Sequence, residues 1–210
     1  MTKFGTNILQ RLPLYLRTLQ QLRSEGHAYA SGSQLAATLG FESIVVRKDL
    51  ARTGVRGKPR LGFPLDLLIP AIERLIGADD ETVAVLVGVG KLGSALLSYP
   101  GFRKQGILIA AGFDAAPERC NLMLSGTPIF PVHTLTETVL RLNAKVGILT
   151  VPEDQAQRAA EQMVAGGVTA IWNFTPASLD LPSEIFVQRE DLAISLAVLL
   201  HRIKEKERAL

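Results

Sequence analysis

Three glycines near the middle of the chain have the spacing of a phosphate-binding turn. The run Gly88-Val89-Gly90-Lys91-Leu92-Gly93 follows a stretch of apolar residues and precedes 91–99, which can form a helix. Gly88 would permit a tight turn, Gly90 would let a pyrophosphate approach the backbone, and Gly93 would let the helix pack closely on the strand. The first N–H groups of the helix would then face the phosphates. This context predicts a dinucleotide site, although the glycines alone also fit an ordinary turn.

An acidic residue follows the next apolar stretch, where a ribose would lie. Asp114 comes about 20 residues after Gly93, the separation at which an acidic side chain binds the ribose 2′-hydroxyl. The same carboxylate would repel a 2′-phosphate, which favours NAD(H) over NADP(H). Arg103 and Lys104 precede this stretch and weaken the preference slightly. An ordinary loop residue is the alternative interpretation of Asp114.

Residues that would let such a domain catalyse hydride transfer are missing. A dehydrogenase needs a group that exchanges the substrate proton and others that orient the substrate. Tyr99 is followed four residues later by Arg103, not by a lysine. The histidines are poorly placed for this role: His27, His133 and His201. We therefore expect no catalytic residues; an NAD-dependent oxidoreductase and a coenzyme A-binding protein, each with a basic N-terminal module, are the alternatives.

The elements that would position this site alternate along the second part of the chain. The candidate strands are 82–87, 107–113, 128–132, 146–151, 168–173 and 184–188. The candidate helices are 91–99, 135–142, 152–165 and 191–207. Continuous apolar strands separated by helices predict an α/β domain with a Rossmann-like parallel sheet covered on both faces.

The first part of the chain has a different pattern. Asn7 can cap a helix whose firm part is 13–24, because Pro13 is awkward within a helix. A cap at 31–33 begins a short helix, 34–39, which Gly40 ends. Residues 42–53 fit a third helix, although the β-branched run 44–46 also permits a strand. Three short helices followed by a glycine-rich basic loop, 54–63, predict a winged helix-turn-helix.

A connecting helix, 64–76, follows this loop, and Gly77 begins the boundary between the two parts. We expect its apolar face to consist of Leu67, Leu68, Ala71, Ile72, Leu75 and Ile76.

Charge is distributed unevenly between the two parts. Residues 1–63 contain ten Lys and Arg against three acidic residues, whereas the remainder contains thirteen against seventeen. A basic module joined to an acidic one predicts that the first part alone meets a polyanion such as nucleic acid. A solvated basic surface is the alternative.

Composition excludes several other classes. No run approaches the roughly 18 uncharged apolar residues of a membrane span, and the first residues lack the pattern of a signal peptide. Cys120 is the single cysteine, which excludes an intramolecular disulfide and fits a reducing cytoplasm. With one cysteine and three histidines we expect no structural metal site.

Several motifs follow one another in order along nearly the whole chain. They are Arg11-Leu-Pro-Leu-Tyr-Leu-Arg17, Val46-Arg-Lys-Asp-Leu50, Gly88-Val-Gly-Lys-Leu-Gly-Ser-Ala-Leu-Leu-Ser-Tyr-Pro-Gly-Phe102, Leu149-Thr-Val-Pro152, Asn173-Phe-Thr-Pro176 and Glu190-Asp-Leu-Ala193. Together they resemble the Rex family of redox-sensing transcriptional repressors. The resemblance implies a winged helix that reads operator DNA and a Rossmann domain that senses the NADH/NAD⁺ ratio. The resemblance further implies that DNA is bound with NAD⁺ or without ligand and is released with NADH.

The resemblance also assigns residues to DNA. Arg47 and Lys48 on the third helix would contact DNA, with arginine suited to guanine and lysine to phosphate. Ser33 and Gln34 could bind phosphate, or could simply cap the second helix. Three basic residues of the wing would reach the minor groove: Arg56, Lys58 and Arg60. The wing departs from the family's Arg-Gly-x-Gly-Tyr-like run, since this chain has Lys58-Pro59-Arg60-Leu61-Gly62-Phe63, and a member that has lost operator binding is a further alternative.

A second set of residues is expected around the cofactor. By resemblance, Tyr99 would hydrogen-bond Asp191 in one redox state, and Arg17 would pair with Asp191 in the other, with Asp191 supplied by the partner subunit. A surface ion pair and a packed tyrosine are the alternative. Four further residues lie in the last positions of strands or directly after them, at the carboxyl edge of the sheet where α/β domains bind ligands: Thr150, Pro152, Asn173 and Phe174.

The last helix carries an apolar stripe that includes Leu192, Leu196, Leu199 and Ile203. The pattern fits equally a partner or the chain's own sheet, and the resemblance favours a helix exchanged in a homodimer. Twofold symmetry predicts a palindromic operator. The expected divisions are 1–77 for the winged helix and connecting helix, 78–188 for the NAD(H)-binding domain, and 189–210 for the dimerisation helix.

Overall fold

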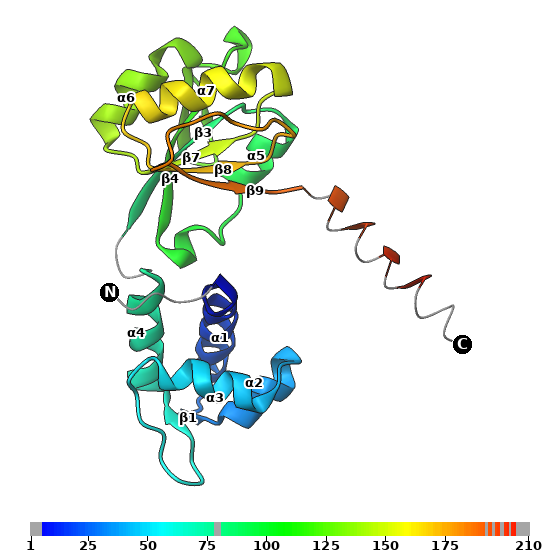
Figure 1. The fold of residues 1–210 in the computed structure, drawn as a ribbon. Coiled ribbons are helices and arrows are strands. Elements are labelled where there is room, and N and C mark those ends of the chain that lie inside the picture. Colours follow the sequence, from blue (N-terminus) through cyan, green and yellow to red (C-terminus); the bar gives the residue numbers. More distant parts are fainter. Residues whose placement is uncertain are drawn as a thin grey trace. The chain divides into compact units, whose positions relative to one another are not determined.

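The chain folds as two compact units, residues 1–80 and residues 81–210. The computed structural model describes residues 6–77, 81–191, 193–194, 196–197, 200–201 and 203–204. Figure 1 shows the helical first unit and the α/β second unit, and each is described by itself below.

The first unit is a winged helix-turn-helix, as the sequence predicts. Its elements are α1 (Thr6–Ser24), β1 (Tyr29–Ala30), α2 (Gly32–Leu39), α3 (Ser43–Ala51), β2 (Phe63–Pro64) and α4 (Leu65–Ile76). Strands β1 and β2 pair antiparallel, with Tyr29 opposite Pro64 and Ala30 opposite Phe63. This short pairing, which the sequence analysis did not anticipate, ties the wing to the start of α2.

Helix α1 begins earlier than expected. It starts at Thr6, so Asn7 is already helical and the predicted cap at Asn7 is wrong. Pro13 lies inside the helix, where it removes one backbone hydrogen bond. The helix continues through it because Ile8 and Leu12 are buried in the core of the unit, and that burial stabilises the first turns.

Helices α3 and α4 show how packing outweighs local preference. The β-branched run 44–46 is helical, since Val46 and Leu50 are both buried on one face. In α4 the expectation for Leu67 is wrong, because its side chain is 57% exposed, whereas Ile69 is buried. The buried face of α4 therefore follows Leu65, Leu68, Ile69 and Ile72, the spacing of one helical side.

Local hydrogen bonds define the turn before α2 and the wing. The Ser31 hydroxyl accepts the N–H of Gln34 at 3.0 Å and caps α2, and Gly40 ends that helix with φ of 69°. In the wing, the N–H of Lys58 donates to the carbonyl of Gly62 at 2.7 Å. Arg60 lies at the turn between them with φ of 66°, a conformation that costs a side-chain-bearing residue energy.

The second unit has the strand order of a dinucleotide-binding Rossmann fold. Its strands are β3 (Thr82–Val87), β4 (Ile107–Asp114), β5 (Met123–Leu124), β6 (Thr127–Pro131), β7 (Val146–Leu149), β8 (Ala170–Asn173) and β9 (Phe186–Arg189). Its helices are α5 (Lys91–Leu97), η1 (Arg103–Gln105), η2 (Pro117–Arg119), η3 (Val132–Thr134), α6 (Leu135–Leu142) and α7 (Glu153–Ala165). In the described part, the sheet order is β5-β6-β4-β3-β7-β8-β9, and β5 pairs antiparallel while the others pair parallel.

The predicted strands and helices between residues 82 and 188 are confirmed, with small shifts at their ends. Helix α5 stops at Leu97 rather than at residue 99 because Pro100 disfavours the helical conformation of Tyr99. Strand β7 stops at Leu149 because the chain turns there towards Pro152, the cap of α7. The small strand β5 has no counterpart in the sequence prediction.

Alternate residues of the central strands face two cores. Val85 and Val87 of β3 pack with α6 and α7, which Figure 1 shows together over the sheet. Ala84 and Leu86 face the other side and pack with Leu97 of α5. The strand order reverses between β3 and β7, so the turn after β3 lies at the point where such sheets bind ligands.

The predicted last helix lies partly outside the described residues, Leu192 and Leu199 among those excluded. Residues 193–194, 196–197, 200–201 and 203–204 are helical. Four of their apolar side chains are between 47% and 62% exposed: Ile194, Leu196, Leu200 and Ile203. Within the described chain, none of the helices combines the length and apolar character needed to cross a bilayer.

The packing of α5 on β3 leads to a stability prediction. A Cβ at Gly93 would overlap the carbonyl oxygen of Gly88, whereas one at Gly90 would meet no atom of the described chain within 4 Å. We expect Gly93→Ala to lower the free energy of unfolding of the second unit by about 1–3 kcal/mol. Gly90→Ala, the matched control, should change it by less than about 0.5 kcal/mol. Urea unfolding of the two variants checks this, and equal stabilities would contradict the close packing.

Candidate functional site

The glycine turn after β3 has the geometry that its spacing predicts. Gly88 has φ of 97°, and a Cβ there would lie 2.6 Å from the carbonyl oxygen of Thr150. Gly93 brings α5 against the turn, as described above. Gly90 caps α5 and leaves the space before its own Cα clear of the described protein atoms. The turn is therefore tight on the protein side and accessible on the other.

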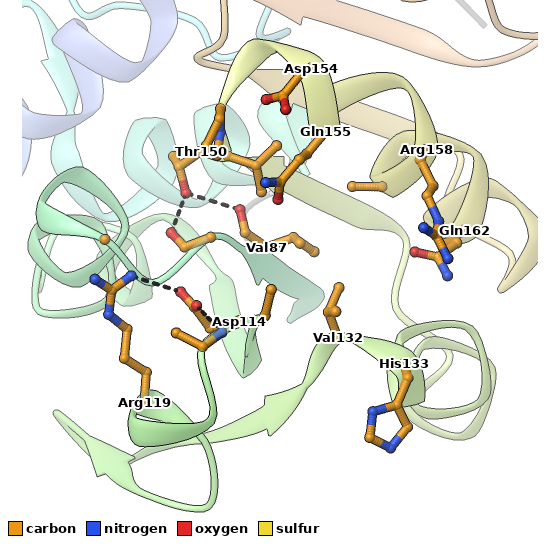
Figure 2. Close-up of a pocket in the computed structure, with 17 residues that line it drawn as sticks. Val87, Asp114, Arg119, Val132, His133, Thr150, Asp154, Gln155, Arg158 and Gln162 are labelled. Atoms are coloured by element: carbon orange, nitrogen blue, oxygen red, sulfur yellow. Dashed lines mark hydrogen bonds and ion pairs between the residues drawn. The ribbon is translucent and has the colours of Figure 1, made fainter.

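The carboxylate of Asp114 holds this turn from the neighbouring strand. Its Oδ2 accepts the N–H of Val89 at 2.7 Å, and its Oδ1 accepts the N–H of Ala116 at 2.9 Å. Asp114 is 7% exposed and ends β4, beside the turn (Figure 2). The arrangement places one fixed negative charge next to the glycines.

Thr150, which follows β7, is hydrogen-bonded to the start of the turn. Its hydroxyl lies 2.8 Å from the carbonyl oxygen of Gly88 and 3.1 Å from that of Val87 (Figure 2). Strands β3, β4 and β7 thus supply the turn, the carboxylate and the hydroxyl, and their carboxyl ends meet because the strands are parallel and adjacent.

A cavity of about 930 Å³ lies beside these groups. Five of the predicted residues line it: Gly88, Gly90, Asp114, Thr150 and Pro152. Three basic side chains that the sequence analysis did not assign to the cofactor also line it: Arg119, His133 and Arg158. They come from separate loops and a helix, so no short motif marks them.

A smaller cavity of about 290 Å³ contains other predicted residues. Leu92, Phe174 and Asp191 line it, together with Glu190. Oδ1 of Asp191 accepts the N–H groups of Ala193 and Ile194 at 2.9 and 3.0 Å, which caps the last helix. In the described chain Leu92 belongs to α5, so the glycine-turn helix lines this second cavity as well.

A row of aromatic rings extends from the α5 end to the edge of the sheet. Ring centroids lie 5.2 Å apart for Tyr99 and Phe102, 5.8 Å for Phe102 and Trp172, and 4.5 Å for Trp172 and Phe174. Trp172 donates its indole N–H to Glu190 at 3.1 Å. Tyr99 is 58% exposed at the end of the row. Two predicted cofactor residues, Tyr99 and Phe174, are thus connected through packed rings.

Asn173 has an internal role. It is fully buried; its Oδ1 accepts the N–H and the hydroxyl of Thr175, both at 2.8 Å, and its amide donates to the carbonyl of Ala177 at 3.0 Å. Its side chain shapes the loop that carries Phe174, and contact with a cofactor stays a prediction for it.

The first unit presents its predicted nucleic-acid residues on the surface. The exposed side chains are Arg47 and Lys48 on α3, Ser33 and Gln34 at the start of α2, and Arg56, Lys58 and Arg60 on the wing. Lys58 also donates from Nζ to the Tyr29 hydroxyl at 2.9 Å. Arg17 is exposed on α1, and its meeting with Tyr99 and Asp191 stays a prediction.

A buried aspartate fixes α3 against α1. Arg11 donates to both carboxylate oxygens of Asp49, at 2.7 and 3.0 Å, and the Tyr15 hydroxyl donates to Oδ2 at 2.9 Å. Asp49 is 5% exposed and Tyr15 is fully buried. Burial, followed by the hydrogen bond to Asp49, raises the pKa of Tyr15 to about 12. This network orients the helix that carries Arg47 and Lys48; the sequence analysis missed it because its residues are far apart in the chain.

A winged helix joined to a Rossmann-type ligand domain defines the class of ligand-responsive transcription regulators. Family models agree with this division. A model described as "CoA binding domain" matches residues 79–177, and one described as "Putative DNA-binding protein N-terminus" matches residues 6–51.

Individual proteins match nearly the whole chain. The redox-sensing transcriptional repressor Rex of Treponema denticola is 40% identical over 191 residues, 91% of this chain and 91% of its own. That of Bacteroides fragilis is 36% identical over 206 residues, 98% of this chain and 94% of its own. The chain therefore belongs to the Rex family of redox-sensing transcriptional repressors.

Solved structures of a family member, the Rex-family repressor RSP, agree with the fold. RSP in complex with beta-NAD⁺ and operator DNA matches with a TM-score of 0.89 and 29% identity, over 99% of this chain and 95% of that one. RSP in complex with beta-NADH matches with a TM-score of 0.85 and 28% identity, over 99% and 97%.

The hydrogen bonds among Arg11, Tyr15 and Asp49 predict that Tyr15 ionises at a higher pH than an ordinary tyrosine. Because the folded-state pKa of Tyr15 lies above its ordinary value of about 10, the neutral phenol stabilises the fold below pH 10, and this contribution is lost as the pH rises through 12. Tyr15→Phe should remove the step near pH 12 from an ultraviolet absorbance titration and lower stability at pH 7 by about 2 kcal/mol. Tyr29→Phe is the control and should keep the step; its persistence in Tyr15→Phe would refute the assignment.

Proposed function

We propose that this chain is a repressor that binds operator DNA and releases it when NADH binds. The observation that carries the proposal is that Gly90 and the carboxylate of Asp114 line one cavity at the reversal point of the sheet. The RSP structures support it, since that relative has been solved with NAD⁺ and operator DNA and with NADH.

The residues of the second unit fit a dinucleotide. The backbone from Gly88 to Gly93 would hold the pyrophosphate, since the space before Gly90 admits it. The fixed carboxylate of Asp114 would accept a hydrogen bond from the ribose hydroxyl. Thr150 and Pro152 would border the adenosine half of the dinucleotide. The nicotinamide half would lie towards Leu92 and Phe174 in the second cavity.

Discrimination between the two redox states follows from charge. The nicotinamide ring is positively charged in NAD⁺ and neutral in NADH, so enclosing it against Leu92 and Phe174 would favour NADH. The two acidic residues of the same cavity already accept hydrogen bonds, Glu190 from Trp172 and Asp191 from the last helix.

The proposed switch consists of Tyr99, Arg17 and Asp191 of the partner subunit, whose carboxylate bonds Tyr99 in one redox state and Arg17 in the other. A difference in affinity between the two ligands can then shift the balance between DNA-binding and released conformations.

DNA recognition is assigned to the exposed face of the first unit. Arg47 would read a base edge, and Lys48 would contact phosphate. Ser33 and Gln34 would contact phosphate at the start of α2, and the basic residues of the wing would reach the minor groove: Arg56, Lys58 and Arg60. Arg60 keeps a positive φ at the wing tip, a conformation that glycine adopts more readily, which is consistent with a function for its side chain.

The assembly is proposed to be a cytoplasmic homodimer on a palindromic operator. The exposed apolar residues of 193–204 provide a face for a second copy. In this arrangement 1–77 reads DNA, 78–188 binds NAD(H) and 189–210 dimerises. The protein is proposed to have no enzymatic activity, since the sequence offers no proton-transfer set of a dehydrogenase.

The match of residues 79–177 to the "CoA binding domain" model favours one other ligand class. Coenzyme A carries a 3′-phosphate on its ribose, which the Asp114 carboxylate would repel. Calorimetry with NADH and with coenzyme A distinguishes the two ligand classes. We expect NADH to bind and coenzyme A to bind at least about tenfold more weakly.

Operator binding across NADH/NAD⁺ ratios at one salt concentration tests the proposed function, with an operator selected from random duplex DNA. We expect NADH to release the DNA and NAD⁺ to leave it bound. In Gly90→Val the added side chain would fill the space proposed for the pyrophosphate. This variant should bind operator as before and no longer respond to NADH. Release of DNA from Gly90→Val at ordinary NADH concentrations would contradict the site.

The two basic residues of α3 should differ in effect. Arg47→Ala should lower operator affinity by about 1–3 kcal/mol and reduce discrimination against other sequences. Lys48→Ala should weaken binding to operator and random DNA alike and reduce the salt slope by about one unit. Fluorescence anisotropy at several salt concentrations measures both. If the two variants lose the same amount of sequence discrimination and of salt dependence, the assignment of Arg47 to a base and Lys48 to phosphate is contradicted.

A further inference from the structure

Arg119 lies against the carboxylate expected to bind the ribose. Its Nη1 is 3.4 Å from Oδ2 of Asp114, and its side chain is 50% exposed and lines the large cavity (Figure 2). It belongs to η2, the short helix in the loop after β4. The ribose edge of the cavity therefore carries a cation as well as the anion that the sequence predicts.

The partners of Asp114 restrict how this pair can rearrange. Each carboxylate oxygen already accepts a backbone N–H, from Val89 or from Ala116, so the anion is fixed. Arg119 is the movable member, because its contact is longer and half of its side chain is in solvent. A ligand group at this edge can draw Arg119 away from Asp114, but it cannot displace Asp114 without breaking the glycine turn.

The loop itself is held in place behind the pair. The Cys120 thiol is buried with Sγ 3.4 Å from the carbonyl oxygen of Asp114 and 3.3 Å from that of Ala116. The N–H of Cys120 donates to the carbonyl of Pro117 at 3.1 Å. The backbone of Arg119 thus has a defined position, and its guanidinium lies at the ribose edge of the cavity.

We propose that Arg119 determines how strongly the site discriminates between NAD(H) and 2′-phosphorylated dinucleotides, an inference that rests on the proposed function. A 2′-phosphate placed at Asp114 is repelled by the carboxylate and attracted by the guanidinium. Arg119 pairs with whichever anion offers the better contact. The protein therefore binds NADPH more weakly than NADH, and the pairing of Arg119 with Asp114 determines the ratio of the two affinities.

The variants separate the two charges. In Arg119→Gln the attraction is removed, so the dissociation constant for NADPH should rise about tenfold, while that for NADH changes less than about threefold. In Asp114→Asn the repulsion is removed and Arg119 is released, so the affinity for NADPH relative to NADH should rise about tenfold. The ratio is compared because the Asn side chain can accept only one of the two backbone N–H groups, which weakens the turn for both ligands. The double variant should lose that gain. Lys145→Gln removes an equal charge from an exposed residue outside the cavity lining and should leave the ratio of the two constants unchanged.

Both ligands can be followed in the full-length protein by energy transfer from Trp172, the single tryptophan, to the reduced nicotinamide. Unchanged NADPH affinity in Arg119→Gln, or a gain that persists in the double variant, would overturn the proposal. If Asp114→Asn fails to fold, the single variant Arg119→Gln decides. If NADPH binding to the unaltered protein is too weak to measure, the comparison of NADPH affinity between Asp114→Asn and the double variant decides. If the unaltered protein does not bind NADH at all, that result would instead contradict the proposed function.

Discussion

The hydrogen bond between the Asp114 carboxylate and the N–H of Val89 is the constraint on which the second unit depends. This bond, 2.7 Å long, ties the turn after β3 to the end of β4. The Asp114 side chain that accepts it is almost completely buried. With Thr150 bonded to the other side of the turn, three adjacent strands fix one loop. A buried carboxylate is stable only with such partners, so the charge proposed to bind the ribose also maintains the turn proposed to hold the phosphates. Geometry of the site and stability of the fold are therefore coupled.

The first unit uses the same device for a different purpose. Asp49 is buried on α3 and receives Arg11 and Tyr15 from α1, so the helix proposed to read DNA is fixed to the helix that carries Arg17. In both units a buried aspartate converts a surface element into a rigid support for residues that meet a ligand. The exposed cations Arg47 and Lys48 therefore lie on a helix whose position does not depend on their own contacts.

Much of this organisation could be predicted from the sequence, and the exceptions have physical causes. The glycine turn and the alternation of strands and helices could be predicted because they depend on short spacings and on apolar segments. The network of Arg11, Tyr15 and Asp49 was not, because charged residues 38 positions apart give no periodic signal. Helix α1 passes through Pro13, and α4 buries Ile69 in place of Leu67, because packing decides between local alternatives. Arg119 was missed since a single arginine in a loop is usually solvated.

The central claim is that NADH bound at the glycine turn releases operator DNA. The most direct measurement follows both events in one sample at fixed salt, with labelled operator for anisotropy and energy transfer from Trp172 for NADH binding. The account predicts that the two signals change over the same range of NADH concentration, and that NAD⁺ leaves the anisotropy at its DNA-bound value. Saturation of the energy transfer while the DNA stays bound would contradict it.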